Sequence, residues 1–410
     1  MNILAVAFRN VGRNKRRGIL SAASIAIAAA VTVVMFALIE GLVVDMESTT
    51  YRMETGQVRI RTKAFDENEM LYPLDLGIRD VSAVVETVRG LSETLALVPR
   101  IPFPTLLYKN GKTYKARGEG IDVPGEETYQ QLSRNLVQGR MPAMGTRETA
   151  LAVGLAADMG LGIGDKFTVW TGTASRGTNA MTFTIVGLLR FTVSSYNRFL
   201  FFAPLDTVQR LLGMPNAAVE VVTILRKGVD PDKAAAAFTS ALGTLGREEL
   251  AASSWKKVGA WYRYLKLADS LYTIFALAFI LLGSTVVINT TMMTVYERVR
   301  EIGTMSALGM TGGRIVAMFF LESLCIGIAG SLAGVLAGVA ITWPLSVRGL
   351  DFSEMMKNMD VSMSSVWHPV LNAKSVILSF VYSAALSGVV SIIPSRRASR
   401  VEPVRALRAI

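Results

Sequence analysis

The sequence predicts a membrane α-helical protein with four transmembrane helices and one large extracytoplasmic α+β domain. Of its 410 residues, 51% are hydrophobic and only 18% are charged, and the mean hydropathy is +0.39. Soluble domains carry about 25% charged residues on average. The apolar residues gather in four long runs, and a stretch of mixed composition separates the first run from the second. This distribution excludes an ordinary soluble protein.

Each of the four apolar runs has the length of a membrane helix, because about 20 residues cross a hydrocarbon core of about 30 Å. The predicted spans are 19–44, 267–296, 315–347 and 376–393. The first run is longer than the core of a signal peptide, which has about 7–15 residues. We therefore expect an uncleaved anchor at 19–44. A cleaved signal peptide is the alternative, since Ala28-Ala29-Ala30 resembles a cleavage region.

The charges beside the spans predict the orientation of the chain. Segments 1–18, 297–314 and 394–410 together carry ten of the formal +11 charges, whereas 348–375 is neutral. Short loops rich in Lys and Arg stay in the cytoplasm. Both termini and the 297–314 loop are therefore predicted to be cytoplasmic, and segments 45–266 and 348–375 to lie outside. The basic balance signals topology and does not indicate nucleic-acid binding.

The outer segment 45–266 has the strand and helix patterns of a folded α+β domain. Valines and leucines from Val81 to Leu91 repeat at helical spacing, and Asn110-Gly111 predicts a hairpin turn between Thr105–Tyr108 and Thr113–Ala116. Further strands are predicted at 148–153, 166–170, 181–188, 200–203 and 219–225, and further helices at 204–212 and 231–245. A folded insertion of this kind suggests a binding or coupling domain.

Few residues of the chain offer groups for catalysis or metal binding. The single cysteine, Cys325, excludes an intramolecular disulfide, and the single histidine, His368, has no companion ligand. A membrane-embedded enzyme would find only Glu40, Glu322 and Cys325 in the spans, with no partner at workable spacing. We therefore expect no catalytic, cofactor or metal site in this chain.

The third span carries a stripe of glycines. Gly327, Gly330, Gly334 and Gly338 recur every three or four residues, which places them on one helix face. Small residues let helix backbones approach closely in a membrane, where hydrophobicity does not drive association. We expect a packing face that meets either another helix of the chain or a partner subunit. The alternative is that glycine is simply common in membrane helices.

The two ends of the membrane part suggest contacts with lipid and with protein. Residues 1–18 predict an amphipathic elbow on the inner membrane surface, whose bases meet anionic lipid or a protein. In the 297–314 loop, Glu297, Arg300 and Glu301 form a charged helical face, and Ile302, Met305 and Leu308 form an apolar one. Such a short helix suits docking into a partner's groove. An ordinary solvated loop is the alternative.

Several of these segments resemble the FtsX-like/MacB-type ABC transporter permeases. The loop sequence 297–303, followed by 306–309, is similar to their cytoplasmic loop, and 394–408 to their closing motif. Gly139-Arg140, together with the glycine-containing stretch 154–165, resembles the MacB-type periplasmic core domain. The resemblance implies such a core domain at 45–266 and an FtsX-like permease domain at about 267–405.

The resemblance implies a non-catalytic transmembrane subunit. In this family, ATP-driven dimerisation of cytoplasmic ABC ATPase subunits is relayed through the membrane helices to the outer domain. The implied partners are an ATPase dimer, which holds the ATP and magnesium, and a second permease copy or a related permease. The residues implied to meet the ATPase are Glu297, Arg298, Arg300, Glu301, Met305, Leu308 and Gly309.

Within the family, four spans, a large insertion and no fused ATPase are most similar to the lipoprotein-releasing permeases of LolC/LolE type. The stretches 117–122 and 136–140 resemble theirs. This similarity implies a lipoprotein and its periplasmic carrier as partners, at the bacterial cytoplasmic membrane. The chain departs from the pattern because it lacks a clear Pro-rich hook for the carrier. An exporter of another envelope-side substrate and a mechanical regulator of a cell-wall hydrolase stay open.

Overall fold

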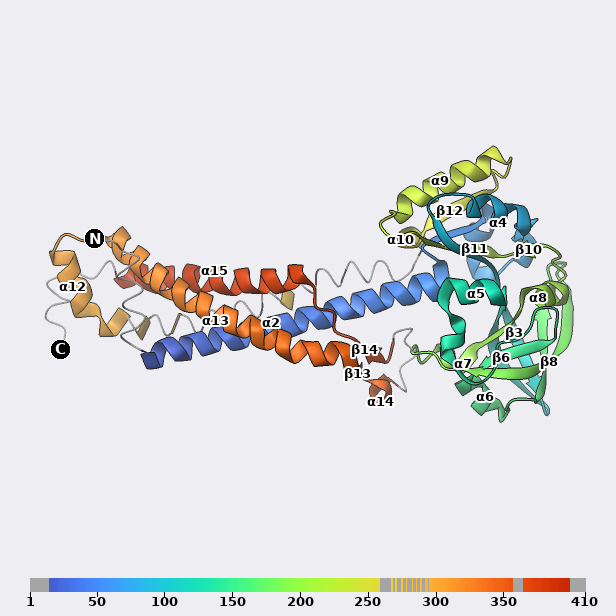
Figure 1. Ribbon diagram of the computed structural model, residues 1–410, viewed down its shortest axis with the longest axis horizontal. Helices are drawn as coiled ribbons and strands as arrows, with labels where there is room; N and C mark the ends of the chain where they lie inside the picture. The colour runs from blue at the N-terminus through green and yellow to red at the C-terminus, as the bar shows by residue number, and fades with distance from the viewer. Residues whose placement is uncertain are drawn as a thin grey trace. The chain divides into compact units, whose positions relative to one another are not determined.

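A computed structural model describes residues 15–258, 295–356 and 364–398, and single positions between 267 and 293 (Figure 1). The chain divides into two compact units. The membrane unit comprises Met1–Val44, Leu265–Leu350 and Trp367–Ile410, and the outer unit comprises Asp45–Tyr264 and Asp351–Val366. Most of the predicted elbow, most of the second predicted span and the tail beyond Ala398 lie outside the described residues.

Three helices among the described residues are long and apolar enough to cross a membrane. They are α2 (Lys15–Thr49), α13 (Gly312–Arg348) and α15 (Ala373–Ala398). They correspond to the first, third and fourth predicted spans. At 1.5 Å per residue, α2 is about 52 Å long, which exceeds a hydrocarbon core of about 30 Å. Some turns of α2 therefore extend beyond the core.

Helix α15 continues beyond the end predicted for the fourth span. The sequence predicts that Pro394 closes this span after Ile393, but the helix runs through Pro394 to Ala398. Membrane helices tolerate proline, and serine hydroxyls of α15 also bond carbonyls of its last turns. Ser391 Oγ donates to the carbonyl of Gly388 at 2.6 Å, and Ser395 Oγ donates to that of Ser391 at 2.5 Å.

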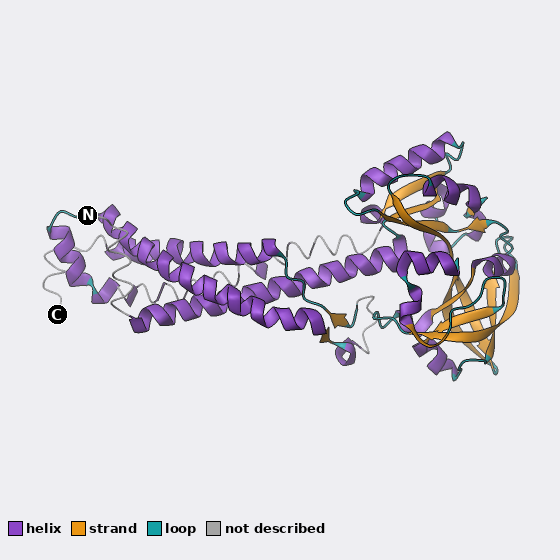
Figure 2. Ribbon diagram, viewed as in Figure 1, coloured by secondary structure: helices purple, strands orange, loops and turns teal. Residues whose placement is uncertain are grey.

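The outer unit is built on a ten-stranded sheet, whose strands are orange in Figure 2. Nine strands follow the order β12-β1-β11-β3-β4-β9-β6-β8-β5, and the tenth, β7, pairs with β3 and β8. Because β7 joins β3 to β8, strands β3, β4, β9, β6, β8 and β7 form a closed ring. Its strands are β1 (Val58–Thr62), β3 (Thr94–Lys109), β4 (Lys112–Ile121), β5 (Leu136–Gly139), β6 (Glu148–Ala152), β7 (Lys166–Gly172), β8 (Thr178–Leu189), β9 (Leu200–Pro204), β11 (Glu220–Leu225) and β12 (Leu250–Ser254). The short strands β2 (Ile78–Arg79) and β10 (Ala217–Ala218) form a separate antiparallel pair.

Strand β3 belongs to both parts of this sheet. Its first half pairs with β11 and its second half pairs with β4, and Arg100 is the residue at which the partner changes. Strands β12, β1 and β11 extend the sheet away from the ring. The core under this extension joins Val58 and Ile60 of β1 to helices α4 (Val81–Arg89) and α9 (Pro231–Thr244), which bury Val84 and Phe238.

The remaining helices are short. They are η1 (a π-helical turn, Thr50–Thr55), α3 (Lys63–Glu67), η2 (Glu69–Leu71), η3 (Leu74–Leu76), α5 (Val123–Gln130), η4 (Leu132–Asn135), α6 (Val153–Met159), α7 (Tyr196–Phe199), α8 (Leu205–Leu212), α10 (Trp255–Val258), α12 (Val299–Ala307) and α14 (Ser353–Met356). Two short strands, β13 (Leu350–Asp351) and β14 (Val366–Trp367), form a separate pair.

The hairpin predicted at Asn110-Gly111 is confirmed. Asn110 and Gly111 have φ of 49° and 77°, the left-handed values that a two-residue hairpin turn requires. Lys109 pairs with Lys112 across the turn. The strands are longer than predicted because pairing continues down to Arg100 and Ile121.

Candidate coupling site

The 297–314 loop contains the short helix α12 and a glycine turn. The backbone N–H of Gly309 bonds the carbonyl of Ser306 at 3.0 Å, and Gly309 has φ of 92°. Glycine adopts this left-handed conformation without the steric cost that other residues meet. Helix α13 begins three residues later, at Gly312. The turn therefore links α12 to the third predicted span through a short connection.

One face of α12 packs inside the membrane unit. Ile302 is buried, and Met305 is partly buried against the same cluster, which includes Ile315, Met318 and Phe319 of α13. Leu308 does not share this face, because six residues at 100° per residue place it about 120° from Ile302. The structure leaves Leu308 83% exposed. The predicted apolar face is thus divided between packing and solvent.

Five of the residues expected to meet a partner are exposed, and they lie at the two ends of α12. Glu297, Arg300 and Glu301 are exposed at its beginning, and Leu308 and Gly309 at its end. These five residues are called the coupling surface. It presents charges of both signs and one large apolar side chain to solvent.

Arg298 departs from the expected docking face. Its side chain is 7% exposed and its Nη1 lies 3.2 Å from Oε2 of Glu322 on α13, whose side chain is 10% exposed. A buried charge is stable only beside a partner, and Glu322 supplies one. Arg298 Nη2 is also buried and has no hydrogen bond within the described part of the chain. Arg298 therefore joins the loop to α13 instead of facing outward.

The glycine stripe of α13 lies against two helices of its own unit. A Cβ at Gly330 or Gly338 would lie 2.6 or 3.0 Å from the carbonyl oxygens of Ala22 or Ala30 on α2. Gly334 is closer still to the backbone of Ala26. On the other side, Gly327 abuts Ser387 of α15. Only glycine allows these approaches, and backbone atoms on the facing helix do not yield.

Serine residues of α15 form a buried stripe that sequence reasoning missed. Ser379, Ser387, Ser391 and Ser395 are buried at intervals of four or eight residues. Ser387 Oγ lies 2.7 Å from the carbonyl oxygen of Ala384 and 3.2 Å from that of Ser323 on α13. The four-residue spacing of serines is visible in the sequence and would have indicated this packing face.

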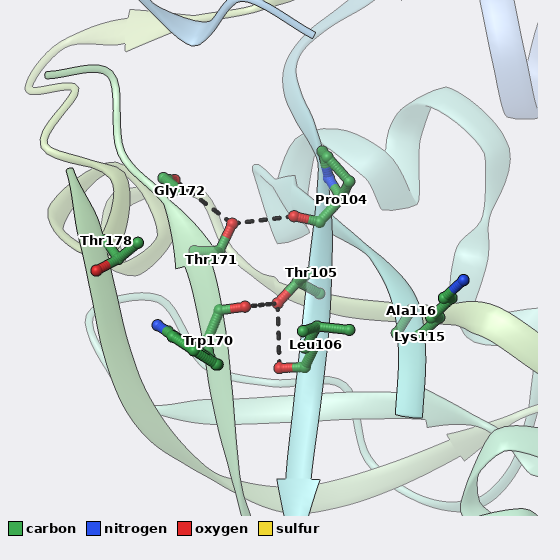
Figure 3. Close-up of a pocket in the computed structure, with 9 residues that line it drawn as sticks. All are labelled: Pro104, Thr105, Leu106, Lys115, Ala116, Trp170, Thr171, Gly172 and Thr178. Carbon is green, nitrogen blue, oxygen red and sulfur yellow. Dashed lines mark hydrogen bonds between the residues drawn. The ribbon is translucent and has the colours of Figure 1, made fainter. Parts of the chain in front are cut away.

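The outer unit contains an open pocket of about 480 Å³ on the ring (Figure 3). Thr105 Oγ1 donates to the carbonyl of Trp170, and Thr171 Oγ1 donates to that of Pro104, which ties β3 to β7. The lining residues are Pro104, Thr105, Leu106, Lys115, Ala116, Trp170, Thr171, Gly172 and Thr178. This mostly apolar lining has no carboxylate, histidine or cysteine that would act in catalysis.

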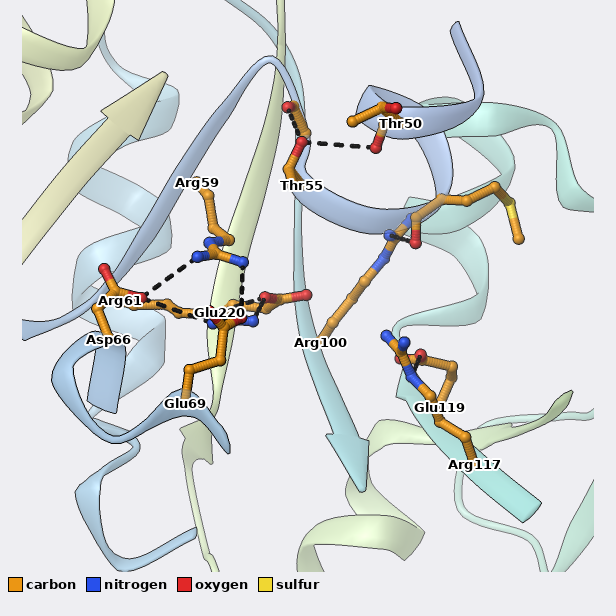
Figure 4. A network of polar contacts seen from close by, with 12 residues as sticks. Thr50, Thr55, Arg59, Arg61, Asp66, Glu69, Arg100, Arg117, Glu119 and Glu220 are labelled. Carbon is orange, nitrogen blue, oxygen red and sulfur yellow. Dashed lines mark hydrogen bonds and ion pairs between the residues drawn. The ribbon is translucent and has the colours of Figure 1, made fainter. Parts of the chain in front are cut away.

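A cluster of charges lies beside the pocket-bearing ring, with Arg59, Arg61 and Glu220 buried on β1 and β11 and Glu69 half-exposed on η2 (Figure 4). Arg61 Nε is 2.9 Å from Glu220 Oε2 and its Nη1 is 2.6 Å from Glu69 Oε1, and Arg59 also contacts Glu69. Burial opposes ionisation of Glu220 and Glu69, but the two arginines outweigh it and hold both pKa values below normal. These are structural ion pairs. Among the described residues no group of three or more His, Cys, Asp or Glu is placed to hold a metal.

The described residues combine long apolar helices, a short exposed loop helix and a folded outer α+β unit. Two family models match the chain: the FtsX-like permease C-terminal model over residues 273–403, and the MacB-like periplasmic core domain model over residues 19–241. The second match alone covers more than half of the chain. The protein therefore belongs to the FtsX-like permeases with a MacB-like periplasmic core, which are non-catalytic membrane subunits of ABC transporters.

Several known proteins are similar to this chain. The lipoprotein-releasing system transmembrane protein LolC of Neisseria meningitidis serogroup B is 24% identical over 350 residues, which cover 82% of each chain. The macrolide export ATP-binding/permease protein MacB of Bdellovibrio bacteriovorus is 32% identical over 130 residues, covering 32% of this chain and 17% of that protein. The crystal structure of the periplasmic region of MacB from Actinobacillus actinomycetemcomitans has a TM-score of 0.38 and 14% identity, covering 51% of this chain and 93% of that one.

Proposed function

We propose that this chain couples ATP hydrolysis by a separate cytoplasmic ATPase to movement of its outer domain, and that it releases lipoproteins from the bacterial cytoplasmic membrane. The coupling surface is the observation that carries the proposal. Its exposed Leu308 offers an apolar anchor, and Arg300 and Glu301 offer charges of both signs. Buried apolar anchors supply most of the affinity at an interface, and flanking charges supply orientation.

The packing of the membrane unit supports a path for the movement. Ile302 and the Arg298–Glu322 pair tie α12 to α13. The glycine stripe brings α13 into backbone contact with α2. Packed helices of this kind shift as rigid elements, because closely packed contacts do not deform continuously. A displacement of α12 by the ATPase is thereby passed to α13 and to α2.

The implied partners follow from the same arrangement. The ATPase dimer binds ATP and magnesium, and this chain binds no cofactor of its own. A second permease copy or a related permease completes the membrane part, and membrane lipids meet the basic elbow at 1–18. The positive-inside rule supports cytoplasmic termini and a cytoplasmic 297–314 loop.

Similarity to LolC along 82% of both chains supports lipoprotein release as the activity. Co-purification with a cell-wall hydrolase, in place of a lipoprotein carrier, would instead support a mechanical regulator. Transport of a different envelope-side molecule would support an exporter. Release of a lipoprotein from proteoliposomes to a soluble carrier, dependent on ATP, distinguishes the three.

Two variants of the coupling surface test the assignment of the docking site. Leu308→Ala removes the apolar anchor, and the pair Arg300→Glu/Glu301→Arg reverses the charge order without changing net charge. We expect each to weaken ATPase binding about tenfold or more, as loss of an anchor residue does. Leu332→Ala, which trims an exposed leucine of α13, is the matched control. Unchanged assembly and ATPase activity in both variants would show that the docking site lies elsewhere.

A further inference from the structure

Helix α2 does not end in an ordinary cap. It passes at Thr50 into the π-helical turn η1, which closes at Thr55 and is followed by Gly56. Turns of this type are rare and concentrate at functional positions. Gly56 has φ of 65°, so the covalent link from η1 to strand β1 runs through a conformationally permissive residue. Gly56 packs closely against Val222 and Thr223, so a movement of α2 carried by this link alone would reach β1 and β11 first.

A buried arginine connects η1 to the sheet directly. Arg100 extends from β3 toward η1 (Figure 4), where its Nη2 donates to the carbonyl of Arg52 at 3.1 Å and its Nη1 to that of Met53 at 3.3 Å. Its other edge faces Glu126 of α5, with Nε 2.5 Å from Oε1 and Nη2 2.9 Å from Oε2. A cation beside the last carbonyls of a helix is stabilising, and hydrogen bonds from charged groups are the strong ones.

Two buried tyrosines hold the residues on either side. Tyr129 of α5 donates its hydroxyl to the carbonyl of Tyr51, and Tyr196 of α7 donates to Oε1 of Glu54, both at 2.7 Å. The guanidinium carbon of Arg100 also lies 4.9 Å from the centre of the Tyr129 ring. Each of the four consecutive residues 51–54 is therefore bonded by a side chain from the body of the outer unit.

We propose that Arg100, Glu126, Tyr129 and Tyr196 form a clamp that fixes the end of α2 to the sheet, and that Arg100 is a positioning residue for transmission of movement. The inference rests on the proposed coupling function. Arg100 lies where β3 changes partner from β11 to β4, so the clamp grips the strand shared by both parts of the sheet. A displacement of α2 is thereby passed to β3 as well as to β1, and so to the ring and its extension together.

Two changes loosen the clamp. Arg100→Lys keeps the charge beside Glu126 but cannot reach both carbonyls, and Tyr129→Phe/Tyr196→Phe removes two hydroxyls at nearly constant volume. The control is Arg61→Lys, which weakens another buried arginine pair of the same sheet, to Glu220. The hydrogen bonds and ion pairs of the Arg61 side chain are to Asp66, Glu69 and Glu220, outside η1. If Arg100→Lys does not assemble with the ATPase, the result for Tyr129→Phe/Tyr196→Phe alone tests the clamp.

The experiment is hydrogen exchange of the full chain, assembled with its ATPase in lipid nanodiscs, without nucleotide and with ATP and vanadate. In both clamp variants we expect exchange at 50–57 to rise about tenfold, since a hydrogen bond from a buried group is lost. We also expect the ATP-dependent change in β3 and β4 to disappear while the ATPase rate is kept. The control should keep the ATP-dependent change.

Two results would overturn the clamp. The first is an ATP-dependent change in hydrogen exchange that persists in both clamp variants. The second is a loss of this change in the control as well, which would reveal general destabilisation of the sheet. If the wild-type complex shows no ATP-dependent change in the outer unit, the coupling function itself fails and the positioning role with it. A response present in wild type and kept in the clamp variants contradicts the clamp alone.

Discussion

The ion pair between Arg298 and Glu322 gives a prediction whose size follows from its geometry. Two unit charges 3.2 Å apart attract by about 5 kcal/mol at an effective dielectric constant of about 20. Desolvation of both groups offsets much of this gain, so the intact pair contributes little net stability. Arg298→Met removes the cation and leaves the carboxylate of Glu322 buried without it. Loss of one partner of a buried pair costs about 3–5 kcal/mol.

The double variant Arg298→Met/Glu322→Met removes both charges and should recover most of that loss. The assay is denaturant unfolding of the purified full chain in detergent, with both single variants and the double variant forming a cycle. We expect Arg298→Met to lose about 3–5 kcal/mol and the double variant to lie within about 1.5 kcal/mol of wild type. If the single losses simply add, or if Arg298→Met matches wild type, the buried pair does not hold α12 to α13.

Three further changes test other parts of the structure. Gly334→Leu should prevent α2 and α13 from packing, because even a Cβ would overlap the backbone of Ala26. Overpacking of this kind costs about 1–3 kcal/mol or more. The control Ala337→Leu, on the exposed face of α13, should keep a thermal stability near that of wild type. Hydrogen bonds from Arg140 and from the Ala143 backbone lower the pKa of Glu148 to about 2. The ionised Glu148 therefore stabilises the fold above about pH 4.5, and this stabilisation is lost as the pH falls toward 2. Glu148→Gln should flatten the acid-unfolding curve in that window, and an unaltered curve would refute the role of the Arg140–Glu148 pair. Gly111→Ala should destabilise the full chain by about 1 kcal/mol, because Gly111 has φ of 77°. Gly243→Ala inside α9 should instead stabilise the chain by about 0.5–1 kcal/mol. Equal effects of the two substitutions on the free energy of unfolding would contradict the turn geometry.

Features encoded by neighbouring residues were predictable from the sequence. Asn110-Gly111 specifies its hairpin because left-handed φ values at two consecutive positions select those residue types. The three described membrane helices follow from hydrophobic length alone. The glycine spacing predicted a packing face, but it did not identify α2 as the facing helix, since periodicity describes one helix and not its neighbour.

Features that depend on distant residues were not predictable in this way. Arg298 lies among exposed charges in the sequence, yet a glutamate 24 residues away draws it inward. Strand β1 was missed because Arg59 and Arg61 interrupt its apolar pattern, and only Glu220, Asp66 and Glu69 explain how they are buried. The clamp joins η1 to residues 47 to 142 positions away, and no local pattern reports such contacts.

The central claim is that ATP hydrolysis in a partner moves the outer domain relative to the membrane helices. Spin labels at Met70→Cys in the outer unit and Ile377→Cys on α15, both exposed positions, in a Cys325→Ala background, measure that movement within one chain. In the assembled complex we predict that the distance distribution shifts when ATP and vanadate are added, and that Leu308→Ala abolishes the shift. An identical distribution with and without nucleotide, in a complex that hydrolyses ATP, would contradict the account.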